Sequence, residues 1–277
     1  MKAVGLVTEY NPFHKGHIYH IEAAQAATGA DVVVAVMSGN FVQRGEPALM
    51  DKWHRAQLAL SHGVDLVIEL PTFFAVQPSH LFADGAIQLL TALNVKQVVF
   101  GSEHADVDFL SLAQQAPDVN QNDQFKQHNQ TFASVYAQQL SDKTGFELKE
   151  PNDILALGYA TAVLKQQSPI ELIPIQRVAA GYHELHFSET QEIASASAIR
   201  LALHKDRAEK IKNVVPNDVY QTLTSEASTI NFEEKFWPLL KYRITTDTVG
   251  QLGQVYQMAE GLEHRLASVM LTEPAPT

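Results

Sequence analysis

Short, continuous hydrophobic runs alternate along the first two thirds of the chain with longer stretches that mix hydrophobic and polar residues. The runs are rich in Val and Ile and lack the alternation of a strand with one face in water, so they predict strands that are covered on both faces. Polar or turn-forming residues close each run. The predicted strands cover residues 6–10, 31–38, 64–71, 96–101 and 170–176.

The stretches between the runs have the spacing of hydrophobic residues that is typical of helices. Strands that alternate with helices indicate right-handed βαβ units. The predicted fold is therefore an α/β, doubly wound, Rossmann-like parallel sheet. The predicted helices cover about 17–28, 52–62, 79–93, 151–164 and 195–205. Pro151-Asn152-Asp153 offers the start of the fourth of these, with a carboxamide and a carboxylate near the free N–H groups.

Two parts of the chain depart from this alternation. Residues 104–150 are rich in Gln, Asn and Asp, and amphipathic stretches at 109–115 and 124–140 predict a helical insertion. Only short helical segments follow Pro216. We therefore expect one α/β domain over residues 1–205 and a helical C-terminal region over 206–277.

Two histidines follow the first predicted strand. Asn11-Pro12 ends that strand, because Pro12 lacks an N–H group and disfavours the helical conformation at Asn11. His14 and His17 would share one face of the next helix, and Gly16 between them leaves space for a ligand to approach. The first turn of a helix attracts phosphate, so this segment is a candidate phosphate site. Chance spacing is one alternative, and a zinc pair is a weaker one, because no cysteine and no third ligand accompany it.

Composition narrows the class of protein. The chain has 277 residues, of which 45% are hydrophobic and 18% charged, as is ordinary for a globular fold. It contains no cysteine, which excludes disulfides and thiol catalysis. No hydrophobic run is long enough for a membrane span, so we expect a cytoplasmic protein without a membrane partner. The net charge of -11 argues against a broad basic surface, and any RNA contact would have to be a local patch.

The loops at the carboxyl ends of the predicted strands carry imidazole, guanidinium, hydroxyl and carboxamide groups together with glycines. Such groups neutralise, orient and admit a polyphosphate, although the chain has no Walker loop and no GxGxxG fingerprint. Structural alternatives exist, because Ser195 and Asn152 can cap helices and Arg44 can be a solvated charge. Gly101 can simply turn the chain. The candidates are His14, His17, Asn40, Arg44, Gly101, Ser102, Glu103, Asn152, Arg177, Ser195, Ser197 and Arg200.

A first strand, HxGH at the first helix and a late SxSxIR helix resemble the HIGH-type nucleotidyltransferase superfamily. Its members activate a carboxylate or phosphate group by attack on the α-phosphate of a nucleoside triphosphate. Within that superfamily, longer motifs resemble the tRNA(Met) cytidine acetate ligase family over nearly the whole chain. These motifs are TEYNPFHKGHIYH (8–20), MSGNFVQRGEPA (37–48), DLVIELP (65–71), FGSE (100–103), PNDILALGY (151–159) and SASAIR (195–200).

The resemblance implies a two-step ligase reaction that forms AMP and pyrophosphate. ATP and acetate would give acetyl-adenylate, and the acetyl group would pass to N4 of the wobble cytidine of elongator tRNA(Met) to form N4-acetylcytidine. His14 and His17 would stabilise the charge that builds on the phosphates. Mg²⁺ is expected with the triphosphate, but no carboxylate cluster identifies its ligands. The implied ATP-binding residues are Val7, Thr8, Glu9, Tyr10, Asn11, Pro12, Phe13, His14, Lys15, Gly16, His17, His20, Gly101, Asn152 and Arg177.

The chain departs from the family pattern in two places. Relatives often have adjacent hydroxyls in the late helix, so the share of Ser195, Ser197 and Arg200 in triphosphate binding is open. Ligases of this family usually continue with further helices after the segment that resembles 260–266, which implies a shortened chain with an incomplete RNA-binding region. A local basic face could still form, with a solvated helix surface as the alternative. Its candidates are Arg207, Lys210, Lys212, Lys241, Arg243 and Arg265.

Two other functions stay open at this point. The chain could be a nucleotidyltransferase that adenylates or cytidylylates a small cofactor precursor, which predicts a small second substrate and no dependence on tRNA. It could also be a nucleotide-binding protein without catalysis, although the histidine pair together with Arg177 and Arg200 argues against this function. Release of pyrophosphate would distinguish a catalytic protein from a non-catalytic one. ATP–pyrophosphate exchange with acetate present or absent is the most informative experiment for the choice between the two catalytic functions.

Overall fold

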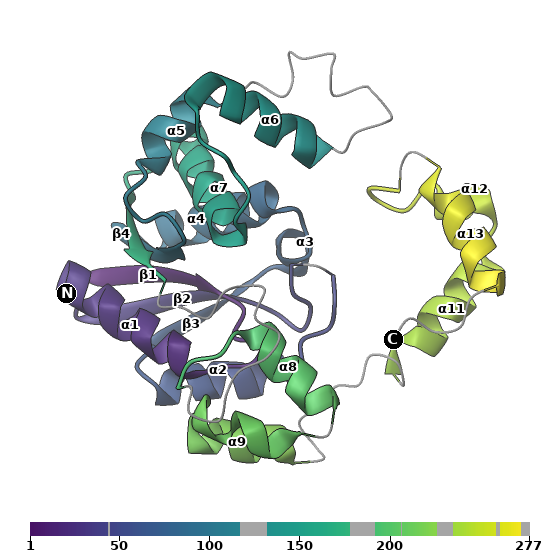
Figure 1. The fold of residues 1–277 in the computed structure, drawn as a ribbon, viewed down its shortest axis with the longest axis horizontal. Helices are drawn as coiled ribbons and strands as arrows, with labels where there is room; N and C mark the ends of the chain where they lie inside the picture. The colour runs from purple at the N-terminus through teal and green to yellow at the C-terminus, as the bar shows by residue number, and fades with distance from the viewer. Residues whose placement is uncertain are drawn as a thin grey trace.

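A five-stranded parallel sheet forms the centre of the molecule, with the strand order β3-β2-β1-β4-β5 (Figure 1). The computed structural model describes residues 1–43, 45–116, 132–177, 192–205, 207–225, 235–258 and 261–272. The chain leaves β1 toward β2 and β3, then returns to place β4 on the other side of β1. The predicted doubly wound α/β sheet is confirmed. The strands are β1 (Ala3–Thr8), β2 (Val32–Ser38), β3 (Leu66–Leu70), β4 (Gln97–Ser102) and β5 (Glu171–Gln176).

The central strands are buried on both faces, as their hydrophobic runs predict. In β2 every residue after Val32 is buried, and four of the six residues of β1 are buried. The first strand begins earlier than predicted and ends at Thr8 instead of residue 10. Tyr10 has a φ of 48°, outside the range of a strand, so the backbone turns here before Asn11.

Helices cover both faces of the sheet (Figure 1). Above it in that view, the α4, α5 and α7 helices pack over a core of Val98, Leu90 and Leu157 among others. Below it, α1, α2, α8 and α9 enclose a second core around Leu6, Ala35 and Ile199. The helices above are α4 (Ser79–Ala92), α5 (Phe109–Gln115), α6 (Phe132–Thr144) and α7 (Pro151–Gln166), and those below are α1 (Lys15–Thr28), α2 (Lys52–Ser61), α8 (Ala196–His204) and α9 (Asn217–Thr224).

The helix predictions agree closely with these bounds. The first helix begins at Lys15, two residues before the predicted start, whereas α7 begins at Pro151 as predicted. Helices α5 and α6 confirm a helical insertion, while residues 117–131 of the predicted insertion lie outside the described residues. A one-turn helix, α3 (Thr72–Ala75), follows β3 and was not predicted.

The C-terminal region is helical, as predicted. The 3₁₀ helix η3 (Ala208–Asn213) and α9 bury Ile211, Val214 and Val219 in the lower core beside α8. Three further helices share a small core of Ile244, Leu252 and Met270. The predicted division near residue 205 stays a prediction. None of the described helices is long and apolar enough to cross a membrane. The last three helices are α11 (Trp237–Thr246), α12 (Val249–Leu252) and α13 (Leu262–Thr272).

Candidate active site

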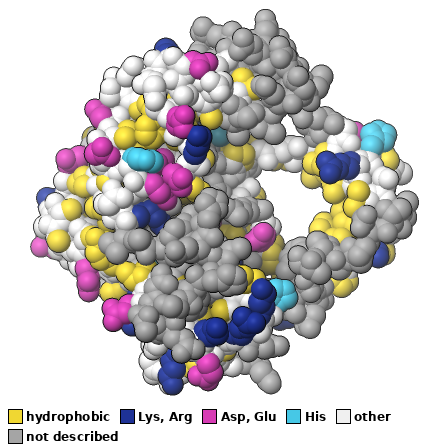
Figure 2. All heavy atoms as spheres, in the orientation of Figure 1, with side chains coloured by type: hydrophobic (Ala, Val, Ile, Leu, Met, Phe, Trp, Pro, Cys, Tyr) yellow, Lys and Arg dark blue, Asp and Glu magenta, His cyan; other side chains and the backbone are white. Residues whose placement is uncertain are grey.

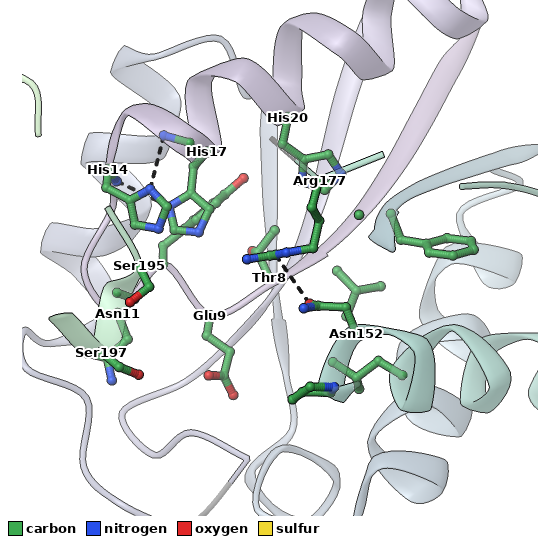
Figure 3. A pocket seen from close by; sticks show the side chains of 18 of the residues that line it. Thr8, Glu9, Asn11, His14, His17, His20, Asn152, Arg177, Ser195 and Ser197 are labelled. Carbon is green, nitrogen blue, oxygen red and sulfur yellow. Dashed lines mark hydrogen bonds between the residues drawn. The ribbon is translucent and has the colours of Figure 1, made fainter. Parts of the chain in front are cut away.

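A cavity of about 340 Å³ lies at the carboxyl edge of the sheet (Figure 3). Its wall comes from the ends of β1, β4 and β5 and from the starts of α1, α7 and α8. The chain leaves β1 and β4 in opposite directions, and ligands of doubly wound sheets bind at such a switch point. Most predicted site residues meet here. Those that line the cavity are Val7, Thr8, Glu9, Tyr10, Asn11, His14, Gly16, His17, His20, Gly101, Asn152, Arg177, Ser195, Ser197 and Arg200.

Six of the predicted residues are absent from this lining, and a seventh is not described. Phe13 is fully buried and stacks on His62, and Asn40 accepts a hydrogen bond from Lys52 N at the start of α2. Pro12 and Lys15 are also absent from the cavity wall, whereas Arg44 lies outside the described residues. Ser102 and Glu103 likewise stand outside the lining, although both contact residues that form it.

The two histidines meet through the helix cap and not through a shared helix face. His14 is the N-cap of α1, and its Nδ1 accepts from Gly16 N at 3.1 Å. His17 Nδ1 accepts from His14 N at 3.2 Å, which completes a capping box built from histidines. The two rings stack with centroids 3.7 Å apart. A Cβ on Gly16 would lie 2.9 Å from His14 Cε1, so the space left by this glycine holds the imidazole.

Burial keeps both imidazoles neutral near pH 7. Burial, with a smaller contribution from the Arg177 charge, lowers the pKa of His14 to about 3. Burial also lowers the pKa of His17 well below its usual value, and the neighbouring His14 adds to this shift. Because each Nδ1 accepts a backbone N–H, each neutral ring carries its proton on Nε2. The pair therefore has two N–H donors, and an anion bound to them would favour imidazolium.

His20 adds a third ring to the cavity wall one turn further along α1. Burial lowers its pKa to about 4, and a hydrogen bond to the Val99 backbone opposes the shift. Its Nε2 is buried and has no hydrogen-bond partner among the described residues. A buried polar atom without a partner is costly unless a ligand or water satisfies it. His20 Nε2 is thus a candidate donor or acceptor for a bound molecule or water.

Arg177 and Asn152 face the histidines. Figure 3 shows the Arg177 side chain extending between His17 and Asn152. Its Nη1 lies 3.4 Å from Asn152 Oδ1 and its Nε lies 3.4 Å from Glu103 Oε1. Asn152 Nδ2 in turn donates to Glu103 Oε1 at 2.5 Å. A Cβ on Gly101 would lie 3.1 Å from Arg177 Cγ, so this glycine lets the arginine cross the end of β4.

Asp153 holds β4 and α7 together beneath this group. The carboxylate is fully buried and accepts from Ser102 Oγ at 2.6 Å and from Glu103 N at 3.0 Å. Its other oxygen lies 2.6 Å from His104 Nδ1, and this hydrogen bond raises the pKa of His104. Sequence reasoning gave Asn152 and Asp153 a capping role, but α7 has no side-chain cap. Asp153 instead positions Asn152 at the cavity.

Arg55 is a buried residue that sequence reasoning missed. Its side chain is fully buried in α2 and donates to three backbone carbonyl groups. Nε donates to Met50 O at 3.0 Å, Nη1 to Glu9 O at 2.5 Å, and Nη2 to Gly39 O. Burial lowers its pKa to about 10, so it stays charged near pH 7. Arg55 thereby fixes the loops that follow β1 and β2. The sequence did hold a signal for this burial. Arg55 precedes the apolar Leu58 and Ala59 by three and four residues, which places it on their face of the helix.

The start of α8 closes the remaining side of the cavity. Ser195 is the N-cap, and its Oγ accepts from Ala198 N at 3.1 Å. Arg200 donates to Asn11 O at 2.7 Å and to Ser197 Oγ at 3.2 Å. Both serines and the arginine line the cavity, so the predicted SxSxIR segment contacts the loop after β1. Ser195 thus both caps α8 and lines the cavity.

The described residues contain no group of three or more His, Asp or Glu side chains that could hold a metal ion. The carboxylates in the described cavity wall are Glu9 and Glu46. Glu9 Oε1 accepts from Gln43 N at 2.8 Å. A cation here would therefore need ligands from a bound molecule as well as from the protein.

Comparison with known proteins is decisive for the family. A family model described as HIGH Nucleotidyl Transferase matches residues 1–274. A tRNA(Met) cytidine acetate ligase of Leuconostoc citreum is 70% identical over 276 residues, which cover 100% of this chain and 70% of the relative. The chain belongs to the HIGH nucleotidyl transferases and, within them, to the tRNA(Met) cytidine acetate ligase family. The relative of the same name from Oenococcus oeni is 48% identical over 99% of this chain and 71% of its own length.

Solved structures of this ligase family agree with the fold. The apo crystal structure of Thermotoga maritima TmcAL has a TM-score of 0.88 and 32% identity, covering 99% of this chain and 69% of that one. A second crystal structure of the same protein, bound with alpha-thio ATP, has a TM-score of 0.83 and 32% identity over 99% of this chain and 68% of that one. The ligase family is thus similar to this chain over its whole length, and the chain spans about 70% of these relatives.

Proposed function

We propose that this chain is an ATP-dependent tRNA(Met) cytidine acetate ligase that uses the cavity at the carboxyl edge of the sheet. Its 70% identity to a ligase of that name, over the whole chain, is the observation that carries the proposal. The substrates would be ATP, acetate and elongator tRNA(Met), and the product would be N4-acetylcytidine at the wobble position. With a tRNA substrate, we place the enzyme in the cytoplasm.

The first step joins acetate to AMP. An acetate oxygen attacks the α-phosphorus of ATP, the bond from that phosphorus to the bridging oxygen of the β-phosphate breaks, and pyrophosphate leaves with the electron pair. Negative charge grows on the leaving group, and preorganised donors stabilise such charge in a site that excludes water. His14 and His17 would supply their Nε2–H groups, while the start of α8 would contact the pyrophosphate through Ser195 and Arg200.

The second step transfers the acetyl group. The N4 amine of the cytidine attacks the acetyl carbonyl carbon, the bond from that carbon to the phosphate oxygen breaks, and AMP leaves while the amine loses a proton. No covalent enzyme intermediate is needed. Arg177 and Asn152 would hold the nucleotide, because neither group gives up a proton near neutral pH but both can orient phosphate, ribose or base.

A magnesium ion would accompany the triphosphate. Mg²⁺ prefers one or two carboxylates together with phosphate oxygens and waters over a cage made only of protein ligands. The cavity wall fits this pattern, because its carboxylates among the described residues are those of Glu9 and Glu46. When bound, the ion would neutralise phosphate charge.

ATP–pyrophosphate exchange with and without acetate tests the proposal. We expect exchange that requires acetate and proceeds without tRNA, and transfer of labelled acetyl groups to tRNA(Met) when tRNA is added. Exchange that ignores acetate but responds to another small acid or phosphate would favour a nucleotidyltransferase for a cofactor precursor. The absence of any exchange would overturn the catalytic proposal.

Arg177→Ala should raise the KM for ATP by about tenfold or more and change kcat much less, because a charged hydrogen bond to the nucleotide is lost. Gly101→Ala is the matched variant. Its methyl group meets Arg177 Cγ at 3.1 Å, so it should displace the same side chain and raise KM to a smaller extent. Initial rates at varied ATP measure both effects. An unchanged ATP requirement in Arg177→Ala would contradict the assignment.

A further inference from the structure

Four exposed cations lie within eight residues after α8: Lys205, Arg207, Lys210 and Lys212, which we call the basic segment. None of the four has an ion-pair partner among the described residues. Two acidic residues, Asp206 and Glu209, lie among them in the sequence, so the cations are in excess by two charges. Glu209 accepts a hydrogen bond from Tyr220 Oη at 3.1 Å. Figure 2 shows Lys and Arg side chains gathered at this end of the molecule. The patch is notable because the whole chain carries a net charge of -11.

The basic segment is anchored directly beside the cavity. Ile211 within it and Val214 after it are fully buried in the lower core. The carbonyl of Val214 accepts from Lys15 N at 3.0 Å, at the residue that follows His14. A second link joins His62 Nε2 to the Asp218 carboxylate at 3.0 Å. The cations therefore have a fixed position relative to the start of α1.

Helix α8 sets the distance between the cavity and the basic segment. Its first turn lines the cavity, and its nine residues lead to the basic segment. At 1.5 Å per residue, the helix places the two about 14 Å apart along its axis. That separation suits a macromolecule that puts one nucleotide in the cavity and its flanking backbone on the surface beside it. A small second substrate would not reach the basic segment.

We propose that the basic segment binds backbone phosphates of the tRNA anticodon stem while the target cytidine enters the cavity. This inference rests on the function proposed above. Helical RNA is recognised mainly through its backbone and shape, and Lys and Arg provide the binding free energy by releasing counterions from phosphates. In an acidic chain, only a local excess of positive charge can hold an RNA against the overall repulsion.

The other basic residues that the sequence singled out lie elsewhere. Lys241 and Arg243 are on α11 and Arg265 is on α13, two helices that share their own small core. Arg243 Nε is also paired with Asp247 at 2.6 Å. These three residues have the same total charge as Arg207, Lys210 and Lys212. They therefore supply a matched control.

The test compares Arg207→Gln/Lys210→Gln/Lys212→Gln with Lys241→Gln/Arg243→Gln/Arg265→Gln. Binding of tRNA(Met) is measured at several salt concentrations, together with acetate-dependent exchange and acetyl transfer. The first triple variant should raise the Kd for tRNA about tenfold or more and reduce the slope of log K against log salt by about 2. Its exchange rate without tRNA should equal that of the parent chain, which shows an intact fold. The second triple variant should bind tRNA like the parent.

Each outcome has a separate meaning. If the parent acetylates tRNA and both triple variants bind it equally well, the proposed surface is wrong and the ligase function stands. An equal loss in both variants would also overturn it, because the effect would then follow net charge alone. A parent chain that catalyses pyrophosphate exchange but transfers no acetyl group to tRNA would instead contradict the proposed function.

Discussion

Replacing His17 by alanine is expected to lower the rate of acetate-dependent ATP–pyrophosphate exchange by about 10²–10³-fold. That is the usual cost of removing one well-placed donor to developing negative charge. His17 Nδ1 is held by His14 N, so its Nε2–H is the atom free to face a ligand. The loss should appear in kcat at saturating ATP, since the interaction would strengthen as pyrophosphate leaves.

Two conservative variants separate this role from packing. Gln places an N–H donor near the position of Nε2, whereas Asn places its polar atoms near Nδ1 and can only restore the bond to His14 N. His17→Gln should recover part of the exchange rate, and His17→Asn should recover the helix cap but not the rate. His204→Ala, on an exposed position at the end of α8, is the control. Undiminished exchange in His17→Ala would sink the proposed mechanism.

Arg55→Met should lower the free energy of unfolding by about 3–5 kcal/mol. Methionine can fill much of the volume but removes the guanidinium hydrogen bonds to three carbonyl oxygens, and each such loss costs about 1–3 kcal/mol. The relief of a desolvated charge offsets part of that sum. Urea unfolding curves measure the effect. Exchange activity at a temperature where the variant is folded should also fall, because the loop that carries Glu9 loses its anchor at Glu9 O.

Gln57→Ala is the control for Arg55, since it changes an exposed residue of the same helix and should shift stability by no more than about 0.5 kcal/mol. Arg55→Lys keeps the charge but has one donor group in place of a fork, so it should restore only part of the stability. Wild-type stability in Arg55→Met would mean that the three carbonyl contacts contribute nothing.

Hydrophobic patterning was sufficient to predict the sheet because its signal is local. The run VVVAVM before Ser38 has no periodic polar residue, and the structure buries it on both faces as β2. Turns were predicted less accurately. β1 ends at Thr8 because Tyr10 adopts a positive φ, and no residue type at that position announces it. The position of the site at the carboxyl ends of the strands followed from the general behaviour of βαβ units, whereas the strand order was not predicted and comes from the structure.

The candidate site also contains residues that local sequence predicts and contacts that it does not. His14, His17, Arg177 and Ser195 could be selected from the sequence because each lies at the start of a helix or after a strand. Contacts across long separations carry no such signal. Asp153 pairs with Ser102 and His104, about 50 positions away, and only the folded chain reveals the contact. Asn40 illustrates the opposite case, since it follows a strand but accepts from Lys52 N outside the cavity wall.

The hydrogen bond from Lys15 N to Val214 O affects the order in which the chain folds during synthesis. All five strands lie within residues 1–176, so the sheet can close while the ribosome is still adding the segments that follow. At roughly 5–20 residues per second, the carbonyl of Val214 is synthesised about 2–8 s after the last strand. Until then the first turn of α1 lacks this support from the chain. A nascent polypeptide thus acquires its sheet first and the finished catalytic cavity only afterwards.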